Sequence, residues 1–315
     1  MAGQADDGDA INPAGRKVEL FDDAVFAELR SKDDVPAAFI NAGWDFDSDF
    51  KAGGGKGGTL MAMVGDSYIV KELSKGDHIA LSKIARSYVR HVCDGETLLC
   101  PIYVHFVDVA TGRFFLAMRN CIGTGENIVL YDLKGCADDK TLEKDGKKIP
   151  AVHKRIWNVG MWLGTSGWSP ERHAYYRGKK DASTAEIQLE ATQRDQVLSC
   201  ICRDTQWLSQ ESLMDYSLLV AVREVSKQQS FPSKSATGAS MAATPFVYSD
   251  ESGRMLEVHI SIIDFLQLWT SGKKVAMCIK VMERNKATVP PKQYGERFYA
   301  YASERFKATS NLVAC

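Results

Sequence analysis

The amino-acid sequence predicts an α+β fold of antiparallel sheets with flanking helices. Two segments with alternating apolar residues, 59–73 and 102–118, each contain a glycine at a predicted tight turn, which is typical of a β-hairpin. Between them, residues 77–92 carry apolar side chains at helical spacing. Because hairpins join antiparallel strands, this half of the chain should form an antiparallel sheet with one long helix.

The remaining elements are expected where the hydrophobic period changes again. Strands are expected at 127–133, 216–222 and 255–265. Further helices are expected within 18–50, over 194–208 and from near Lys292 onward. Asp77 is the predicted N-cap of the helix at 77–92.

Two segments are expected to lack regular structure. Residues 1–17 are small and acidic, which predicts a disordered tail. Residues 226–245 are polar and small, which predicts a mobile insert. No element is predicted for 138–185, and its lysine pairs at 147–148 and 179–180 are interpreted as solvated loop charges.

The composition is that of a globular protein and argues against several classes. The chain of 315 residues is 45% hydrophobic and 25% charged, and its net charge of -1 provides no overall positive field for nucleic acid. It shows no apolar run of about 20 residues, as a membrane span needs, and no secretory signal is expected. The eight cysteines, mostly within apolar runs, indicate a reducing compartment. Zinc-binding and serine-hydrolase motifs are missing.

A glycine-rich loop before the first predicted hairpin suggests phosphate binding. The loop consists of Gly54, Gly55, Lys56, Gly57 and Gly58. Backbone N–H groups of glycines can approach phosphate oxygens because no Cβ stands in the way. Lys71, on the second strand of that hairpin, could contact the α- and β-phosphates of a nucleotide. The alternative interpretation is a flexible loop beside a surface lysine.

Two aspartates lie at the mouths of predicted buried strands. Asp264 follows the apolar run ISII, and Asp215 directly precedes YSLLVAV. Removing polar groups from water is costly, so a carboxylate at such a position needs a reason. Phosphoryl transfer uses one carboxylate to hold Mg²⁺ and another to orient or deprotonate the attacking hydroxyl. The alternative is that each aspartate caps a turn or a helix.

Further charged residues have two interpretations each. Asp132 ends a predicted strand, and Lys134 follows it two residues later. Lys134 could meet a phosphate or could pair with that aspartate, and the spacing leaves both open. Lys273 and Lys274 precede an apolar run, which suits an interfacial segment as well as a plain amphipathic helix.

Together these segments resemble the phosphatidylinositol phosphate kinase family. The resemblance is carried by GGKGGTLM, YIVKEL, FFLAMRN, LYDLKG, LMDYSLLV, ISIIDFLQ and VPPKQYGERF, in the family's order. The motif MDYSLL, and DLKG followed by IID, are specific to this family. The same segments argue against a protein kinase, because H-R-D, D-F-G and A-P-E are missing.

The resemblance implies a two-lobed lipid-kinase domain over 18–310, with an N-lobe near 18–120 and a C-lobe near 121–310. ATP would bind between the lobes, with Mg²⁺ as cofactor, and the inositol ring of a phosphatidylinositol monophosphate would be phosphorylated. The chain would then be cytoplasmic and peripheral at a membrane leaflet that contains the phosphoinositide. A homodimer is possible.

The resemblance also implies roles at matched positions of the nucleotide site. The glycine loop at 54–58 would cover the phosphates, and Lys71 would hold an ATP phosphate. Met118 and Asn120 would belong to the hinge near the adenine. Asp264 would be the Mg²⁺ ligand.

On the lipid side, the resemblance makes Asp215 the catalytic-loop acid. Asp132 and Lys134 match the DLKG pair, whose lysine faces the substrate phosphate. Lys273 and Lys274 would be the membrane-seeking pair of the specificity loop.

Two departures bear on the substrate. Asp138 and Asp139 follow DLKG, where relatives carry serine and then basic residues. In the family that the chain resembles, members that act on the 5-phosphate carry alanine at the position of Ala276, whereas the frequencies within the family favour a phosphatidylinositol 4-phosphate 5-kinase. The expected type is therefore the 5-kinase. The alternatives are a phosphatidylinositol 5-phosphate 4-kinase and a catalytically weak phosphoinositide-binding scaffold.

Overall fold

A computed structural model describes residues 17–36, 60–150, 169–225, 241–250, 252–270 and 288–309, together with the backbone of Lys51–Ala52. It divides into two compact units. Unit 1 comprises the described residues up to Asp94 and Pro101–Asn120, and unit 2 comprises Gly95–Cys100 and the described residues from Cys121 onward.

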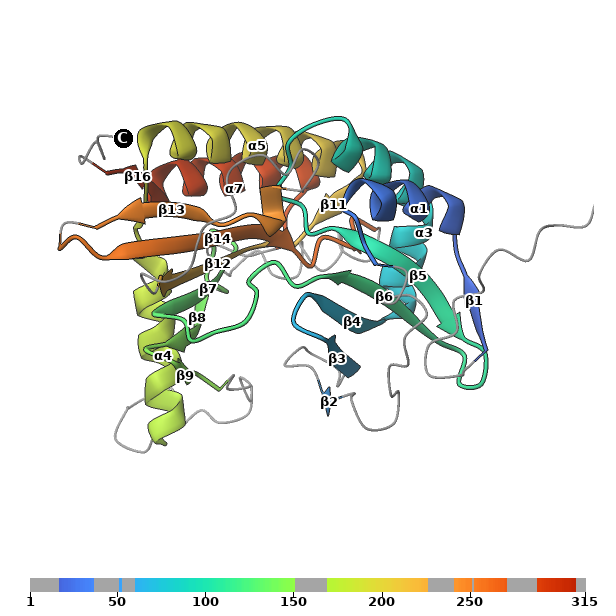
Figure 1. Cartoon of the computed structure of the whole chain (residues 1–315), viewed down its shortest axis with the longest axis horizontal. Helices are drawn as coiled ribbons and strands as arrows, with labels where there is room; N and C mark the ends of the chain where they lie inside the picture. Colours follow the sequence, from blue (N-terminus) through green and yellow to red (C-terminus); the bar gives the residue numbers. More distant parts are fainter. Residues whose placement is uncertain are drawn as a thin grey trace, which may run out of the picture. The chain divides into compact units, whose positions relative to one another are not determined.

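Unit 1 is built on a sheet of six strands in the order β1-β5-β6-β4-β3-β2 (Figure 1). Its strands are β1 Val18–Leu20, β2 Lys51–Ala52, β3 Leu60–Val64, β4 Tyr68–Leu73, β5 Ile102–Asp108 and β6 Arg113–Arg119. Its helices are α1 Asp23–Lys32 and α3 Lys75–Cys93. Every pairing in this sheet is antiparallel, which confirms both predicted hairpins.

Helix α3 begins two residues before the predicted segment, and its predicted N-cap is wrong. Ser74 is the N-cap, and its hydroxyl oxygen accepts from the backbone N–H of Asp77 at 3.1 Å. The Asp77 carboxylate accepts from that hydroxyl at 2.8 Å. A short hydroxyl side chain three residues before a carboxylate is a capping pattern, so Asp77 belongs to the first turn.

The core of unit 1 lies where its helices meet the sheet. The predicted apolar stripe of α3 is buried: Leu81, Ile84 and Tyr88 are each 0% exposed. The Tyr88 hydroxyl also accepts from the backbone N–H of Ile102 at 2.8 Å, which ties α3 to the start of β5. Burial of such side chains stabilises by roughly 1.5–3 kcal/mol each.

Unit 2 contains a second six-stranded antiparallel sheet in the order β13-β14-β12-β7-β8-β9. Its strands are β7 Val129–Leu133, β8 Lys140–Lys144, β9 Lys147–Lys148, β12 Ser217–Glu224, β13 Phe246–Ser249 and β14 Met255–Ile263. Two small pairs complete the strands: β10 Ile187–Leu189 with β16 Phe306–Ala308 in parallel, and β11 Leu213–Met214 with β15 Gln267–Leu268. The α+β class is thus confirmed.

The helices of unit 2 are α4 Pro170–Ser183, α5 Ala191–Gln210, the 3₁₀ helix η3 Met241–Ala243 and α7 Pro291–Arg305. Helices α5 and α7 run side by side (Figure 1). A Cβ at Gly295 of α7 would lie 3.0 Å from the Ser209 hydroxyl oxygen and 3.2 Å from the Thr205 carbonyl oxygen of α5. The bare glycine therefore permits this close approach.

The region 138–185, for which no element was predicted, is partly regular. It contains β8, β9 and the whole of α4, so the lysine pairs at 147–148 and 179–180 lie in a strand and a helix rather than in loops. Ser169 caps α4, since its hydroxyl accepts from the Arg172 N–H, and Pro170 occupies the first helical position. The strongly polar sequence of α4 hides its helical period.

Segment Gly95–Cys100 belongs to unit 2 because it binds two of its elements. Leu99 forms a parallel bridge with Ile262 of β14. Asp204 of α5 is 0% exposed and accepts from the Thr97 hydroxyl at 2.7 Å and from the Leu98 N–H at 2.8 Å.

Among the helices that the structure describes, none is long and apolar enough to cross a bilayer.

Candidate active site

Three neighbouring strands of unit 2 bring the predicted chemical groups to one edge of the sheet. Strand β7 ends at Leu133, opposite Leu218 of β12, and β12 begins at Ser217, opposite Ile263 at the end of β14. Lys134 follows β7, Asp215 precedes β12, and Asp264 follows β14. Antiparallel register therefore gathers residues that lie far apart in the sequence.

Lys134 contacts Asp215 directly. Its ammonium donates to the Asp215 carboxylate Oδ1 at 2.7 Å and to the Asp215 carbonyl oxygen at 2.6 Å. Burial alone would lower the pKa of Lys134, but the charge and hydrogen bond of Asp215, with the charges of Asp132 and Asp264, outweigh it and raise the pKa. Lys134 is therefore a firmly protonated cation among three acids.

Both acids at the mouths of the strands adopt left-handed backbone conformations. The φ angle is 64° at Asp215 and 57° at Asp264. Aspartate tolerates this region better than most residues, but the conformation persists only where surrounding contacts determine it. Directly after Asp215, the Tyr216 carbonyl accepts from the Tyr294 hydroxyl of α7 at 2.5 Å. Helix α7 thereby fixes the turn that carries Asp215.

The two interpretations of Lys134 and Asp132 can now be separated. Asp132 pairs with Lys140, its partner across the β7–β8 ladder, with 2.8 Å between Nζ and Oδ2. Lys134 pairs with Asp215 instead. Residues directly opposite on paired strands lie side by side on one face of the sheet, which explains the partner of Asp132.

Asp139 has a structural role at this site that the sequence reasoning missed. It is 4% exposed, and its Oδ1 accepts from the backbone N–H of Lys134 at 2.6 Å and of Cys136 at 3.4 Å. Burial raises the pKa of Asp139, and the N–H donors of Lys134 and Cys136 oppose that rise. Far from disrupting the DLKG segment, Asp139 holds its turn. The detectable signal is an aspartate shortly after a glycine turn, because such side chains accept from nearby backbone N–H groups.

Gly135 makes this turn possible. Its φ angle is +68°, and an added Cβ would lie 3.0 Å from Cβ and Cγ of Tyr301 on α7. Any other residue would meet both backbone strain and this contact. The turn that presents Lys134 is thus specified by Gly135, by Asp139 and by Tyr301.

The predicted nucleotide residues of unit 1 lie on β4, on β6 and just beyond. Lys71 of β4 is directly opposite Leu116, and Ile69 is opposite Met118. Lys71 and Met118 therefore share one face of the sheet at diagonal positions. Asn120 binds the β3–β4 turn, since its backbone N–H donates to the Ser67 carbonyl at 2.7 Å and its side-chain amide donates to the Asp66 carbonyl at 2.9 Å.

The remaining predicted positions lie outside the described residues. These are Gly54, Gly55, Lys56, Gly57 and Gly58 of the glycine loop and Lys273, Lys274 and Ala276 of the specificity loop. Lys71 lies in unit 1, whereas Asp215 and Asp264 lie in unit 2. Their predicted convergence on one nucleotide, and the two-lobed arrangement, stay predictions.

The acids at the sheet edge suit one kind of metal. Within the described ranges, no cluster of three or more His, Cys, Asp or Glu side chains could hold an ion by itself. Mg²⁺ needs less, because it commonly binds one or two carboxylates together with substrate phosphates and water. The carboxylates of Asp264 and Asp215, which lie beside buried strands, offer oxygen ligands that fit this requirement.

Comparison with known proteins decides the family. The family model described as Phosphatidylinositol-4-phosphate 5-Kinase matches residues 48–255 and 248–305. The chain belongs to the phosphatidylinositol phosphate kinase family. The matched ranges include the four predicted site residues Lys71, Lys134, Asp215 and Asp264.

Two curated relatives show how divergent this kinase family member is. It is 21% identical to a protein of Plasmodium falciparum (isolate 3D7) named phosphatidylinositol 4-phosphate 5-kinase, over 80% of this chain and 15% of that protein. It is 22% identical to a Xenopus tropicalis protein named phosphatidylinositol 5-phosphate 4-kinase type-2 gamma, over 93% of this chain and 77% of that protein. The chain thus spans only a small part of the Plasmodium relative.

Proposed function

We propose that the chain transfers the γ-phosphoryl group of ATP to the inositol ring of a phosphatidylinositol monophosphate and forms a bisphosphate. One observation carries this proposal: Lys134, Asp215 and Asp264 meet at one edge of the unit 2 sheet, with 2.7 Å between Lys134 Nζ and Asp215 Oδ1. Phosphoryl transfer to an alcohol uses carboxylates to orient the hydroxyl and hold the metal, and positive charge to neutralise phosphate oxygens. The two acids and the lysine at this edge supply these groups.

In this proposal Asp215 orients the inositol hydroxyl and takes its proton. The hydroxyl oxygen forms a bond to the γ-phosphorus while the bond between that phosphorus and the bridging oxygen of ATP breaks, which releases ADP. Asp264 would hold Mg²⁺, which would supply positive charge for the phosphate oxygens. Positioning and charge neutralisation supply most of the rate in such reactions.

Lys134 has a second partner in the proposed reaction. Its side chain is 17% exposed, so the ammonium remains reachable from one side while it holds Asp215. We assign to it the phosphate already present on the substrate ring. Asp132 would act indirectly in this reaction: its ion pair with Lys140 ties β7, the strand that leads to Lys134, to β8.

For the nucleotide, the sheet of unit 1 supports Lys71 as the phosphate contact and Met118 as an adenine contact, because both lie on one face. Asn120 would position the chain after Met118 through its two bonds to the β3–β4 turn. The glycine loop at 54–58 would cover the phosphates.

The type of kinase is part of the proposal. The description of the matching family and the Plasmodium name support a phosphatidylinositol 4-phosphate 5-kinase. Ala276 and the name of the Xenopus relative favour the 5-phosphate 4-kinase alternative. We further propose a cytoplasmic protein, peripheral at a membrane leaflet through Lys273 and Lys274.

The test is a kinase assay on the purified chain with labelled ATP, Mg²⁺ and vesicles that contain either monophosphate isomer. We expect a labelled bisphosphate whose isomer, separated by chromatography, reports the type. Asp215→Asn should lower the rate about a hundredfold or more. Asp181→Asn is the matched control, because that carboxylate pairs with Lys144 at the surface of unit 2.

Other outcomes separate the rival functions. Vesicle binding without product, and without thermal stabilisation by ATP and Mg²⁺, would indicate the phosphoinositide-binding scaffold. Phosphorylation of soluble inositol phosphates in preference to vesicles would indicate a soluble substrate. If Asp215→Asn and Lys71→Ala both matched the wild type, the proposed roles would be wrong.

A further inference from the structure

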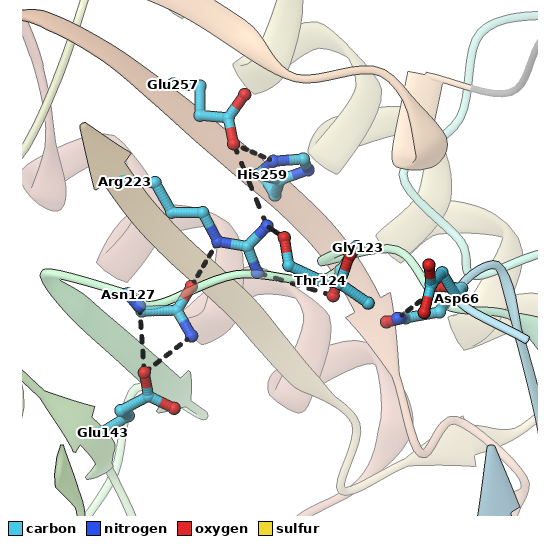
Figure 2. Close-up of polar contacts among 9 residues, drawn as sticks. Asp66, Gly123, Thr124, Asn127, Glu143, Arg223, Glu257 and His259 are labelled. Atoms are coloured by element: carbon cyan, nitrogen blue, oxygen red, sulfur yellow. Dashed lines mark hydrogen bonds and ion pairs between the residues drawn. The ribbon is translucent and has the colours of Figure 1, made fainter. Parts of the chain in front are cut away.

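A buried arginine holds the segment that leads from unit 1 strand β6 into unit 2 strand β7. Arg223, near the end of β12, is 6% exposed. Figure 2 shows its guanidinium against the segment of residues 123–127. Nε donates to the Asn127 side-chain oxygen at 2.8 Å, and Nη1 donates to the Thr124 carbonyl at 2.8 Å. A longer contact of 3.5 Å joins Nη2 to the Gly123 carbonyl.

The segment is shaped around this guanidinium. Gly123 and Gly125 have φ angles of +61° and +127°, and a Cβ at Gly123 would lie 3.5 Å from Nη1 of Arg223. Both glycines adopt conformations that other residues rarely take, and they leave the donors access to the backbone carbonyls. The path of residues 123–127 therefore depends on the arginine fork.

Asn127, which accepts from Arg223, is itself held by a second buried polar side chain. Glu143 of β8 is 9% exposed, and its Oε1 accepts from the Asn127 backbone N–H at 2.9 Å and from its side-chain amide at 3.1 Å. Asn127 is thus fixed with its oxygen toward Arg223 (Figure 2). On the other side, Glu257 lies 3.9 Å from Arg223 and 3.2 Å from His259.

The short hydrogen bonds of Arg223 go to neutral oxygen atoms, whereas its acidic partner Glu257 lies 3.9 Å away. Burial lowers the pKa of Arg223, and the charges of Glu257 and Glu143 oppose this effect. A buried cation is costly unless its donors are satisfied. Here the donors are satisfied chiefly by one connecting segment, so this segment is what the arginine stabilises.

We propose that Arg223 is a positioning residue for adenine nucleotide binding, because it fixes the chain that leaves the Met118–Asn120 region. This inference rests on the proposed function, in which Met118 and Asn120 lie near the adenine. Asn120 is anchored to the β3–β4 turn at its own end, and Arg223 anchors the following segment at Thr124, four residues further on. Small displacements of such a support can cost as much as about a hundredfold.

The experiment compares Arg223→Lys and Arg223→Gln with the wild-type chain. Lysine keeps the charge but lacks the planar fork, so it cannot hold Nε- and Nη-type contacts together. We expect the dissociation constant for ATP, measured by calorimetry, and the KM for ATP to rise about tenfold or more. The KM for the lipid in vesicles should stay unchanged. Arg254→Gln is the control, because Arg254 pairs with Asp250 at the exposed β13–β14 turn.

Each result decides the inference. Unchanged ATP affinity in Arg223→Lys overturns the inference. A variant with a lower unfolding free energy, whose KM for the lipid rises as much as its KM for ATP, also overturns it, because the arginine would then be purely structural. Asn127→Ala, which removes the side-chain acceptor, should reproduce part of the effect on ATP. A wild-type chain that binds ATP but makes no bisphosphate would refute the proposed function alone, whereas a wild type that does not bind ATP would overturn both.

Discussion

Tyr294 of helix α7 donates its hydroxyl to the backbone carbonyl of Tyr216, with 2.5 Å between the oxygens. The two rings also meet edge to face, with centroids 4.6 Å apart. Tyr216 is the residue after Asp215, so α7 controls the conformation of the turn that presents the proposed catalytic acid. Burial raises the pKa of Tyr294 well above its ordinary value, so its hydroxyl stays a donor at neutral pH.

Tyr294→Phe removes this donor and leaves the ring in place. The Tyr216 carbonyl then lacks its partner, which should lower the unfolding free energy by about 1 kcal/mol. Since the Asp215 turn loses a support, kcat should fall about tenfold with little change in KM for ATP. Steady-state kinetics and urea unfolding measure the two effects. Tyr299→Phe, on the exposed side of α7, is the control, and equal kinetics for both variants would contradict the role of Tyr294.

The bonds of Asp139 to the DLKG turn give a second prediction. Asp139→Ala leaves the N–H groups of Lys134 and Cys136 without their acceptor, so the unfolding free energy should fall by roughly 1–3 kcal/mol. Because the turn carries Lys134, kcat/KM for the lipid should fall more than the affinity for ATP. Denaturant unfolding and vesicle kinetics test this.

Asp138 provides the matched control for that prediction. It is adjacent and exposed, so Asp138→Ala should change neither stability nor kinetics noticeably. If the two alanine variants had the same unfolding free energy and the same lipid kinetics, Asp139 would not stabilise the turn. Loss of stability with unchanged lipid kinetics would separate its structural role from the positioning of Lys134.

Local patterns predicted much of the fold, and long-range contacts limited the rest. The hairpins around Gly65 and Gly112 and helix α3 could be predicted because period and turn chemistry are encoded within about twenty residues. Helix α4 could not, because its apolar stripe is weak and its packing partner β8 lies elsewhere in the sequence. Strand β9 is two exposed lysines and exists only because β8 pairs with it.

The same distinction applies to the site. Asp215 and Asp264 could be singled out because a carboxylate beside an apolar strand is unusual. The pairing of Lys134 with Asp215 could not, since it depends on the register of β7 with β12 across 81 residues. The bond between Arg223 and Thr124 likewise arises only when β12 lies beside the connecting segment. Spacing along the chain carries no information on such register.

A buried histidine pair predicts acid sensitivity. His105 of β5 is 1% exposed, and its Nε2 lies 3.0 Å from Nδ1 of His78 on α3. Burial, with the nearby His78, lowers the pKa of His105 to about 3. Below pH 6.5 the unfolded chain therefore binds a proton that the folded chain does not, so this group costs stability as pH falls from 6.5 toward 3.

Between pH 7.5 and pH 5, this single group should reduce the unfolding free energy by about 2 kcal/mol. His105→Phe removes the titrating ring nitrogen atoms and keeps an aromatic side chain. Urea unfolding at both pH values should show a smaller loss in this variant than in the wild type, and His91→Gln should lose as much as the wild type. A variant that retains the wild-type pH dependence would contradict the buried, neutral state of His105.

Asp204 of α5 gives the last prediction, because its carboxylate is the anchor of segment Gly95–Cys100 in unit 2. Its two oxygens accept from the Thr97 hydroxyl and the Leu98 N–H, and the residue is 0% exposed. Asp204→Ala leaves two buried donors without acceptors, so we expect a loss of roughly 2–5 kcal/mol in unfolding free energy. Asp195→Ala on the same helix, where the side chain is 71% exposed, should lose less than about 0.5 kcal/mol. Denaturant unfolding followed by circular dichroism compares the two, and similar losses would show that the anchor contributes no more than a surface carboxylate.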